Sequence, residues 1–436
     1  MKRIPRLAPH LRNAPSFPQS VSTTVSATTI VAAAILLANH AVAALADTGA
    51  DQAPQAAQET PAGLVPKDSP YLETTIEGVP CTSELEVLER TRTQMVEYGI
   101  DFLRNAQEDN GGFTTEKGIG PSIIVAIGLL HSGLPTDDPM LAQVLAYILR
   151  AVQVDGGIYT PNSHISVYES CLALTCLSLA RQVSGSDEYN EILENGEKFI
   201  RGEQYSEENG TDRNDKRYGG LGYGKNSRPD LSNTQFFVET LRDLGADFDD
   251  QAVQDAVVFV SRCQNFAPGD VGETEGKEEK NDGGFIYTCL TKENPAGQEA
   301  SGGLRSYGSI TYAGLKSLIY AGLSESDPRV EAASGWIREN YSTTKNPGLG
   351  QRGLYYYYHT MSKTLDILGN QLFADSEGRN HFWRGELIKV FAERQRMDGS
   401  WVNDNPMWYE SDPNLVTGYA LIVLSYCEPG GKETAQ

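Results

Sequence analysis

A stretch near the carboxyl end, Gln395-Arg396-Met397-Asp398-Gly399-Ser400-Trp401, shows the pattern that decides the fold. It joins one segment of helical apolar period to the next, and its glycine permits a tight turn. Related loops recur along the chain after Gln107, Gln153, Gln204, Gln264 and Asn340. The intervals between successive positions are 46, 51, 60, 76 and 55 residues. This spacing indicates one helical hairpin per repeat, with loops of varying length.

The second helix of each repeat is predicted from apolar residues at helical spacing. These segments are Ile123–Leu134, Val167–Ala180, Phe236–Leu244, Ile310–Leu323, Met361–Leu368 and Leu415–Leu424. Left-handed helix caps are expected at Gly133, Gly245, Gly322 and Gly369. Six hairpins make twelve helices, and a closed ring buries both ends without the polar caps that a linear solenoid needs. The sequence therefore predicts an all-α fold, an (α/α)6 toroid of six helical-hairpin repeats.

Composition restricts the classes of function. The 436 residues carry a formal net charge of −22, which disfavours nucleic acid as a partner. Apolar residues make up 39% and charged residues 22%, proportions that exclude wholesale disorder and a polytopic membrane protein. Six cysteines are too few for a disulfide scaffold. Cys171 and Cys176 are expected to be buried thiols, whereas Cys263 and Cys289 flank one loop and could pair.

The amino-terminal segment predicts export. A basic start precedes the apolar run Thr28–Ala38, and two small-x-small sites end at Ala43 and Ala46. The run is shorter than the ~18 residues that a membrane span requires, so a cleaved signal is favoured over an anchor. The predicted organisation is a signal peptide (1–46), a flexible tether and lead-in (47–83), the repeat domain (84–430) and a disordered tail (431–436). The mature protein is expected to be secreted or periplasmic, with no stable membrane span.

The repeat motif carries a family resemblance. Gln395-x-x-x-Gly399-x-Trp401 matches the QW repeat of squalene and oxidosqualene cyclases, and weaker copies begin at Gln107 and Gln153. The Gly-Gly loops also look like those of protein prenyltransferase β-subunits. Over residues 84–430 the chain resembles the terpenoid-cyclase/protein-prenyltransferase toroid superfamily, as a bacterial secreted member. The resemblance implies an inner ring of second helices around a central cavity, with the glutamine, glycine and aromatic residues in structural roles.

The chemistry that the resemblance implies is not supported at its defining positions. Class II cyclases protonate an alkene with the central aspartate of a DxDD motif, whereas the comparable stretch here is Asp230-Leu231-Ser232-Asn233. A hydroxyl cannot supply that proton. Prenyltransferases hold zinc with Asp-x-Cys and a distant histidine, and residues 307–311 and 414–417 lack these ligands. The sequence predicts neither squalene cyclisation nor a metal site, and no cofactor.

Superposing the terminal glycines of three predicted inner helices aligns polar residues in layers facing the cavity. The three layers are Ser232, Ser309 and Tyr356, then Gln235, Tyr312 and His359, then Glu239, Lys316 and Lys363. A polar central pocket for an unidentified small molecule or polymer is therefore predicted. The candidate catalytic residues are His359 and Tyr312 as proton carriers and Lys363 facing an anion. The candidate ligand-binding residues are Gln235, Glu239, Lys316, Tyr356, Tyr358, Glu169 and Asp230.

Alternative interpretations remain open at this stage. Glu239, Lys316 and Lys363 could form a buried ion network, in which case Lys363→Met would leave Glu239 unpaired, and His359 could simply be hydrogen-bonded. The favoured function is an exported prenyltransferase/squalene-cyclase-repeat toroid protein whose catalysis is unproven. The alternatives are a non-catalytic binding or scaffold protein, or a polysaccharide-lyase-like enzyme that uses tyrosine and histidine in the same pocket.

Overall fold

Two concentric sets of helices make up most of the described chain, which in this computed structural model is residues 75–76, 79–80, 82–266 and 281–429. The inner set is α3 (Gly120–His131), α5 (Ser166–Ser184), α7 (Leu231–Leu244), α9 (Gly308–Tyr320), α11 (Leu354–Ile367) and α13 (Pro413–Tyr426). The outer set is α2 (Thr82–Ala106), α4 (Pro139–Leu149), α6 (Asn190–Gly202), α8 (Gln251–Arg262), α10 (Pro328–Asn340) and α12 (Trp383–Arg394). The predicted six hairpins are thus present.

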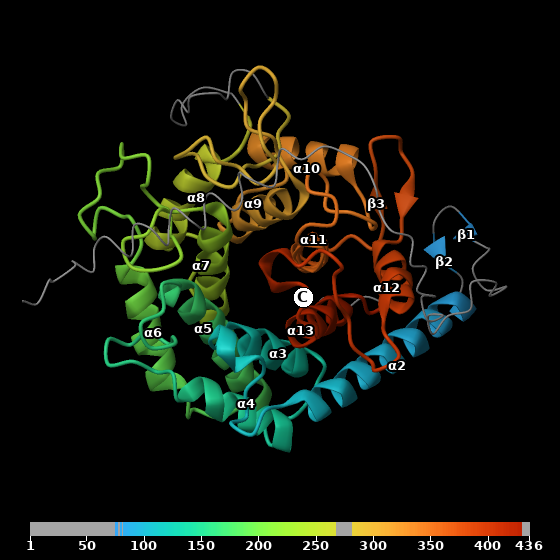
Figure 1. The fold of residues 1–436 in the computed structure, drawn as a ribbon. Coiled ribbons are helices and arrows are strands. Elements are labelled where there is room, and N and C mark those ends of the chain that lie inside the picture. The colour runs from blue at the N-terminus through green and yellow to red at the C-terminus, as the bar shows by residue number, and fades with distance from the viewer. Residues whose placement is uncertain (1–74, 77–78, 81, 267–280, 430–436) are drawn as a thin grey trace, which may run out of the picture. The chain divides into compact units, whose positions relative to one another are not determined.

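The inner helices follow one another around a ring (Figure 1). Each of α3, α5, α7, α9 and α11 packs against the next, and α13 packs against α3, which closes the ring. Outside them, α4, α6, α8 and α10 pack on α3, α5, α7 and α9, whereas α2 contacts α12 and α13. These contacts confirm the predicted all-α toroid.

Short elements complete the described fold. Two 3₁₀ turns, η2 (Thr115–Lys117) and η3 (Met407–Tyr409), lie in loops that lead into α3 and α13. The strand β1 (Thr75–Ile76) pairs antiparallel with β2 (Val79–Pro80), and β3 (Phe373–Ala374) pairs antiparallel with β4 (Asn380–His381). The predicted signal peptide and disordered tail lie outside the described residues. Among the helices that the structure describes, none is long and apolar enough to cross a membrane.

Helix ends follow local sequence rules. The carboxylates of Asp138, Asp250 and Asp327 accept hydrogen bonds from backbone N–H groups in the first turns of α4, α8 and α10, which have no intrahelical partner. The predicted caps after the inner helices adopt positive φ, including Gly245 at 101° and Gly322 at 80°. The ends of these helices are therefore fixed by residues that the sequence identifies.

The repeat glutamines join neighbouring hairpins. The Gln395 amide donates to the carbonyls of Gly399 and Met95, both at 2.9 Å, and so ties the last loop to α2. Gly399 has φ 88°, and a Cβ there would lie 2.2 Å from the Tyr98 carbonyl oxygen. Gln107, Gln204 and Gln264 likewise bridge their loop to the start of the next outer helix. The repeat glutamines therefore link successive hairpins, and Gln395 links the last hairpin back to α2. This is the structural role expected for them.

Burial distinguishes the inner helices from the outer ones. Residues 121–130 of α3 and 415–426 of α13 are buried on every side, as expected for helices enclosed by protein. In α6, by contrast, only Leu193, Gly196 and Ile200 are buried, which gives it one apolar face. Cys171 and Cys176 are buried as predicted, and the thiol of Cys289 donates to the Lys216 carbonyl at 3.8 Å.

Candidate functional site

A buried ion triad occupies the inner ring. Glu239 on α7 accepts hydrogen bonds from the ammonium groups of Lys316 on α9 and Lys363 on α11, one at each carboxylate oxygen. Lys316 is completely buried, and Lys363 is only 9% exposed. Alignment of the helix-ending glycines predicted that these three residues lie at the same height in the ring, and the structure shows them in contact. Because two lysines share one carboxylate, loss of either lysine would still leave Glu239 paired.

Burial and charge act in opposite directions within the triad. Burial alone would raise the pKa of Glu239, but the two ammonium groups outweigh it and lower that pKa. Burial lowers the pKa of Lys316, and Lys363 lowers it further against the attraction of Glu239. Nearby, burial raises the pKa of Asp243 to about 6. In the described structure, both lysines are thus paired with Glu239, a carboxylate of this chain.

His359 lies one turn before Lys363 on α11. Its ring is 5.6 Å from the ring of Tyr419 and 6.4 Å from that of Tyr356, measured between centroids. Burial, followed by the charge of Lys316, lowers the pKa of His359 to about 3, so the imidazole is neutral at pH 7. Its Nδ1 is buried and forms no hydrogen bond among the described residues. Because this pKa lies far below 7, the imidazole is a weak base at neutral pH, and His359 is better suited to hydrogen bonding than to proton transfer.

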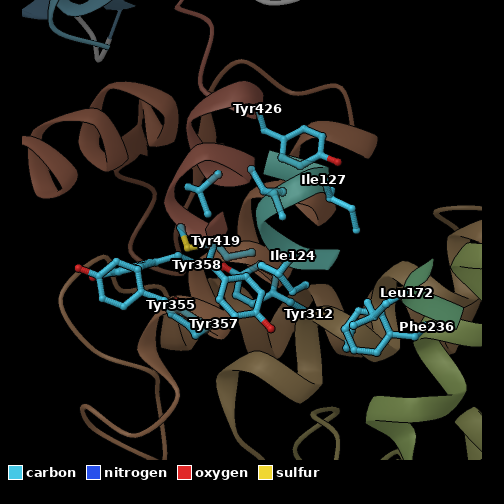
Figure 2. Close-up of a cluster of buried hydrophobic side chains, with 14 of the residues drawn as sticks. Ile124, Ile127, Leu172, Phe236, Tyr312, Tyr355, Tyr357, Tyr358, Tyr419 and Tyr426 are labelled. Carbon is cyan, nitrogen blue, oxygen red and sulfur yellow. The ribbon is translucent and has the colours of Figure 1, made fainter. Parts of the chain in front are cut away.

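The other two members of the predicted His359 level are more deeply enclosed. Gln235 is completely buried, and neither atom of its amide has a hydrogen-bond partner in the described structure. Tyr312 is 1% exposed, and its ring meets the ring of Tyr357 edge-on at 5.8 Å. In Figure 2 the rings of Tyr355, Tyr357 and Tyr358 gather on one side of the cluster, away from Phe236. Tyr312 therefore packs with a neighbouring tyrosine and makes no ring contact with His359.

A continuous series of rings, which we call the aromatic row, leads from the surface to His359. Tyr223, which is 37% exposed, contacts Tyr168 at 5.9 Å, and Tyr168 contacts Phe236 at 5.5 Å. Phe236 then contacts Tyr356 at 6.3 Å, and Tyr356 adjoins His359. The Tyr356 hydroxyl and the Ser232 hydroxyl are 3.1 Å apart. This hydrogen bond joins α7 to α11, the two inner helices that pack on either side of α9.

The aromatic row keeps some contact with solvent. Tyr168, Ser232 and Tyr356 are half-buried although all three belong to inner helices. Burial raises the pKa of both Tyr168 and Tyr356. The phenols therefore stay protonated at neutral pH, as hydrogen-bond donors with aromatic faces. The predicted layer of Ser232, Ser309 and Tyr356 therefore includes one hydroxyl pair, Ser232 with Tyr356, which lies beside the aromatic rings of Tyr168 and Phe236.

Three further candidates hold the fold together. Glu169 accepts hydrogen bonds from the backbone N–H and hydroxyl of Thr160, which joins α5 to its preceding loop. Asp230 caps α7 and accepts from the Asn233 backbone N–H at 2.9 Å and side-chain amide at 2.8 Å. Tyr358 donates to the Thr343 carbonyl at 2.7 Å, in the loop after α10. Burial raises the pKa of Asp230 to about 6.

Sequence reasoning missed Glu410. Its buried carboxylate accepts from the Tyr356 backbone N–H at 2.9 Å and from the Asn403 amide at 2.6 Å. α11 begins after Gly353 without a side-chain cap of its own, so Glu410 satisfies its first turn from another loop. A carboxylate at this end is also favoured by the helix dipole. Glu410 thereby fixes the helix end that carries Tyr356. The only signal in the sequence was an acidic residue in a loop. Because a loop has no helical period, the sequence does not indicate which helix end that residue reaches.

Comparisons with known proteins concern the fold. No protein-family model matches the chain. The curated proteins likewise gave no match. Among solved structures, the type II terpene cyclase MstE from Scytonema is similar, with 11% identity, 78% of this chain and 98% of that chain covered, and a TM-score of 0.49. A Scytonema MstE variant in complex with the product merosterolic acid A is 13% identical, with 79% of this chain and 98% of that chain covered and a TM-score of 0.48. An alpha-amylase from Clostridium perfringens is 11% identical, with 77% of this chain and 97% of that chain covered and a TM-score of 0.48.

Proposed function

We propose that this toroid binds a small, uncharged organic molecule along the aromatic row. The observation that carries the proposal is the unbroken series of ring contacts from exposed Tyr223 inward to His359. Aromatic faces bury apolar ligand surface, and a few placed polar groups orient it. The hydroxyls of Ser232 and Tyr356 lie beside these faces and suit a ligand hydroxyl or carbonyl.

An isoprenoid alcohol fits this chemistry. Its hydrocarbon chain would lie on the rings of Tyr168, Phe236 and Tyr356, and its hydroxyl would replace or extend the Ser232–Tyr356 hydrogen bond. Charged ligands are less well matched, because Lys316 and Lys363 already bind Glu239. The lysines, first expected to face a ligand anion, are better explained as partners of this chain's own carboxylate.

Binding is better supported than acid–base catalysis. Ser232 stands where a cyclase needs a strong acid, and Asp230 already accepts two hydrogen bonds from Asn233. A tyrosine base, as a lyase would need, requires a lowered pKa, whereas burial raises the pKa of Tyr168 and Tyr356. The neutral His359 is proposed to orient a ligand through hydrogen bonding. We therefore favour a binding protein over a cyclase or a lyase.

We also propose, independently of ligand binding, that the protein is exported. The basic start, the apolar run 28–38 and the small-residue sites before Asp47 support a cleaved signal. Amino-terminal sequencing of the native protein should begin at Asp47 or close to it. Recovery of soluble cytosolic protein that still begins with Met1 would contradict export without affecting the binding proposal.

The binding proposal is tested by titrating the purified protein with geranylgeraniol. Tyr356→Ala should weaken binding at least ten-fold, because it removes both a ring face and a hydroxyl from the aromatic row. Tyr358→Ala is the matched control on the same helix, since the Tyr358 hydroxyl bonds to the Thr343 carbonyl. Geranylgeraniol that fails to bind, or that binds both variants equally, would overturn the proposal.

A further inference from the structure

Backbone strain is concentrated where the last hairpin meets the first. Of five residues other than glycine with φ in the left-handed region of the described chain, three lie here: Thr114, Trp408 and Tyr409, at 51°, 58° and 63°. The Asn414 amide donates to the Thr114 hydroxyl at 3.0 Å. The ammonium of Lys117 lies 5.5 Å from the Tyr409 ring centroid. The loops 111–119 and 402–412 therefore meet, and we call their junction the seam.

Two aromatic rings at the seam are supported by protein on one side. Gly353, with φ 62°, lies so close to Trp408 that a Cβ there would be 2.8 Å from two atoms of the indole. Lys117 lies over Tyr409. Yet Trp408 is 47% exposed and Tyr409 is 59% exposed. Both rings are thus held in place while much of their surface remains open to solvent.

The turn that presents these rings is anchored rather than loose. The next residue, Glu410, is buried and bonded to the Tyr356 backbone and the Asn403 amide. A left-handed backbone is strained for bulky residues, and exposed rings add little to the stability of the fold. Folding alone therefore does not account for tryptophan and tyrosine at positions 408 and 409. Strain of this kind is found at ligand clamps, where surrounding structure holds it.

We propose that Trp408 and Tyr409 form a stacking platform for a neutral saccharide. A sugar ring presents an apolar C–H face to an aromatic ring and carries hydroxyls at its edge for hydrogen bonding. Rigid Tyr and Trp side chains give such contact area at low entropic cost. The proposal uses residues outside the aromatic row, so it goes beyond the binding of an organic molecule inside the ring.

Charge at the seam disfavours an anionic ligand. Residues 398–412 contain Asp398, Asp404, Glu410 and Asp412 and no lysine or arginine. Together with the net charge of −22, this disfavours polyanionic saccharides. Lys117 already occupies the cation position over Tyr409, which disfavours an organic cation on that ring. Neutral hydroxyls carry neither penalty.

Tryptophan fluorescence tests the platform directly. Trp336, Trp383 and Trp401 are at most 5% exposed, so acrylamide quenching of the native protein reports mainly on Trp408. Maltotriose or cellotriose should protect Trp408 from quenching, whereas trigalacturonate and choline should not. Tyr409→Leu should weaken this saccharide binding at least ten-fold. Tyr98→Leu on α2, where the tyrosine is 40% exposed, is the matched control and should leave it unchanged.

Calorimetry completes the test for Trp408→Ala, which removes the fluorescent probe. This variant should also lose at least ten-fold in affinity for the protecting saccharide, with an unchanged circular dichroism spectrum. The proposal would be overturned if neither neutral saccharide protected Trp408 from quenching, or if only trigalacturonate or choline did. Protection that changed with protein concentration but not with saccharide concentration would overturn it as well. Phe236→Ala, in the aromatic row, should not affect saccharide binding. The two proposals can therefore fail separately.

Discussion

Replacing Glu239 by glutamine should destabilise the toroid more than replacing either lysine that it binds. Glu239→Gln leaves Lys316, which is completely buried, and Lys363, which is 9% exposed, without their carboxylate. Removing one partner from a buried ion pair costs about 3–5 kcal/mol of unfolding free energy. We expect a loss in that range at pH 7.

The lysine variants differ because the triad holds two cations. In Lys363→Met, Glu239 keeps its bond to Lys316, so no carboxylate is left unpaired. The loss is one charge-assisted hydrogen bond, worth about 1.5–3 kcal/mol, and it is partly offset by relief of repulsion between the ammonium groups. We expect a net loss of at most about 2 kcal/mol. The sequence alone, without the second lysine contact, had indicated a large loss for this substitution.

The pH dependence of Glu239→Gln gives an independent check. Burial already lowers the pKa of Lys316, and loss of Glu239 removes the attraction that opposed this effect. Between that lowered folded-state pKa and the unfolded value of 10.5, the unfolded chain binds more protons than the folded chain. Stability of the variant should therefore rise with pH across this window.

Urea unfolding followed by circular dichroism measures these differences at pH 7 and pH 9. The combined replacement Glu239→Leu, Lys316→Leu and Lys363→Met should recover much of the loss, because no buried charge remains. Equal losses for Glu239→Gln and Lys363→Met, with unchanged dependence on urea concentration, would refute the reasoning. A Glu239→Gln variant whose stability falls between pH 7 and pH 9 would refute it as well.

Three other substitutions test the supporting structure. Burial raises the pKa of Asp230 from 3.8 to about 6, so the folded protein binds more protons between these values and loses stability as pH rises through them. Asp230→Asn, which can still cap the helix, should reduce that slope in urea titrations from pH 4 to pH 7 and gain up to about 3 kcal/mol at pH 7. Asp243, whose pKa is also raised to about 6, should keep part of the slope in this variant. Glu410→Ala should lower the free energy of unfolding by about 1–2 kcal/mol, because α11 loses its cap. An unchanged melting temperature in calorimetry would contradict this role for Glu410. Gly399→Ala should lower the melting temperature more than Gly369→Ala, because both have positive φ but only Gly399 closely faces the Tyr98 carbonyl; equal effects would contradict the close approach.

The fold was predictable because its signals are local. Helical apolar periods, loop glycines and repeat glutamines each lie within a few residues of the structure that they specify. The same local signal set the height of Glu239, Lys316 and Lys363, since each lies a fixed number of residues before a helix-ending glycine. Their contact followed from register alone.

The direction of side chains was less predictable. A step of four residues turns a helix by about 40° beyond a full turn, so Tyr312 does not point quite as Lys316 does. The Tyr312 ring packs against Tyr357 on the neighbouring helix, and residue spacing along α9 alone does not specify that contact. Tyr223 and Glu410 reach the site from loops, whose paths no period specifies. Tertiary packing therefore decides which aromatic residues form the inner surface.

A crystal structure of the protein soaked with geranylgeraniol would test the central claim most directly. The account predicts density for the hydrocarbon chain along Tyr168, Phe236 and Tyr356, with the ligand hydroxyl within hydrogen-bond distance of Ser232 or Tyr356. Density only at the seam, or only elsewhere on the surface, would contradict binding along the aromatic row.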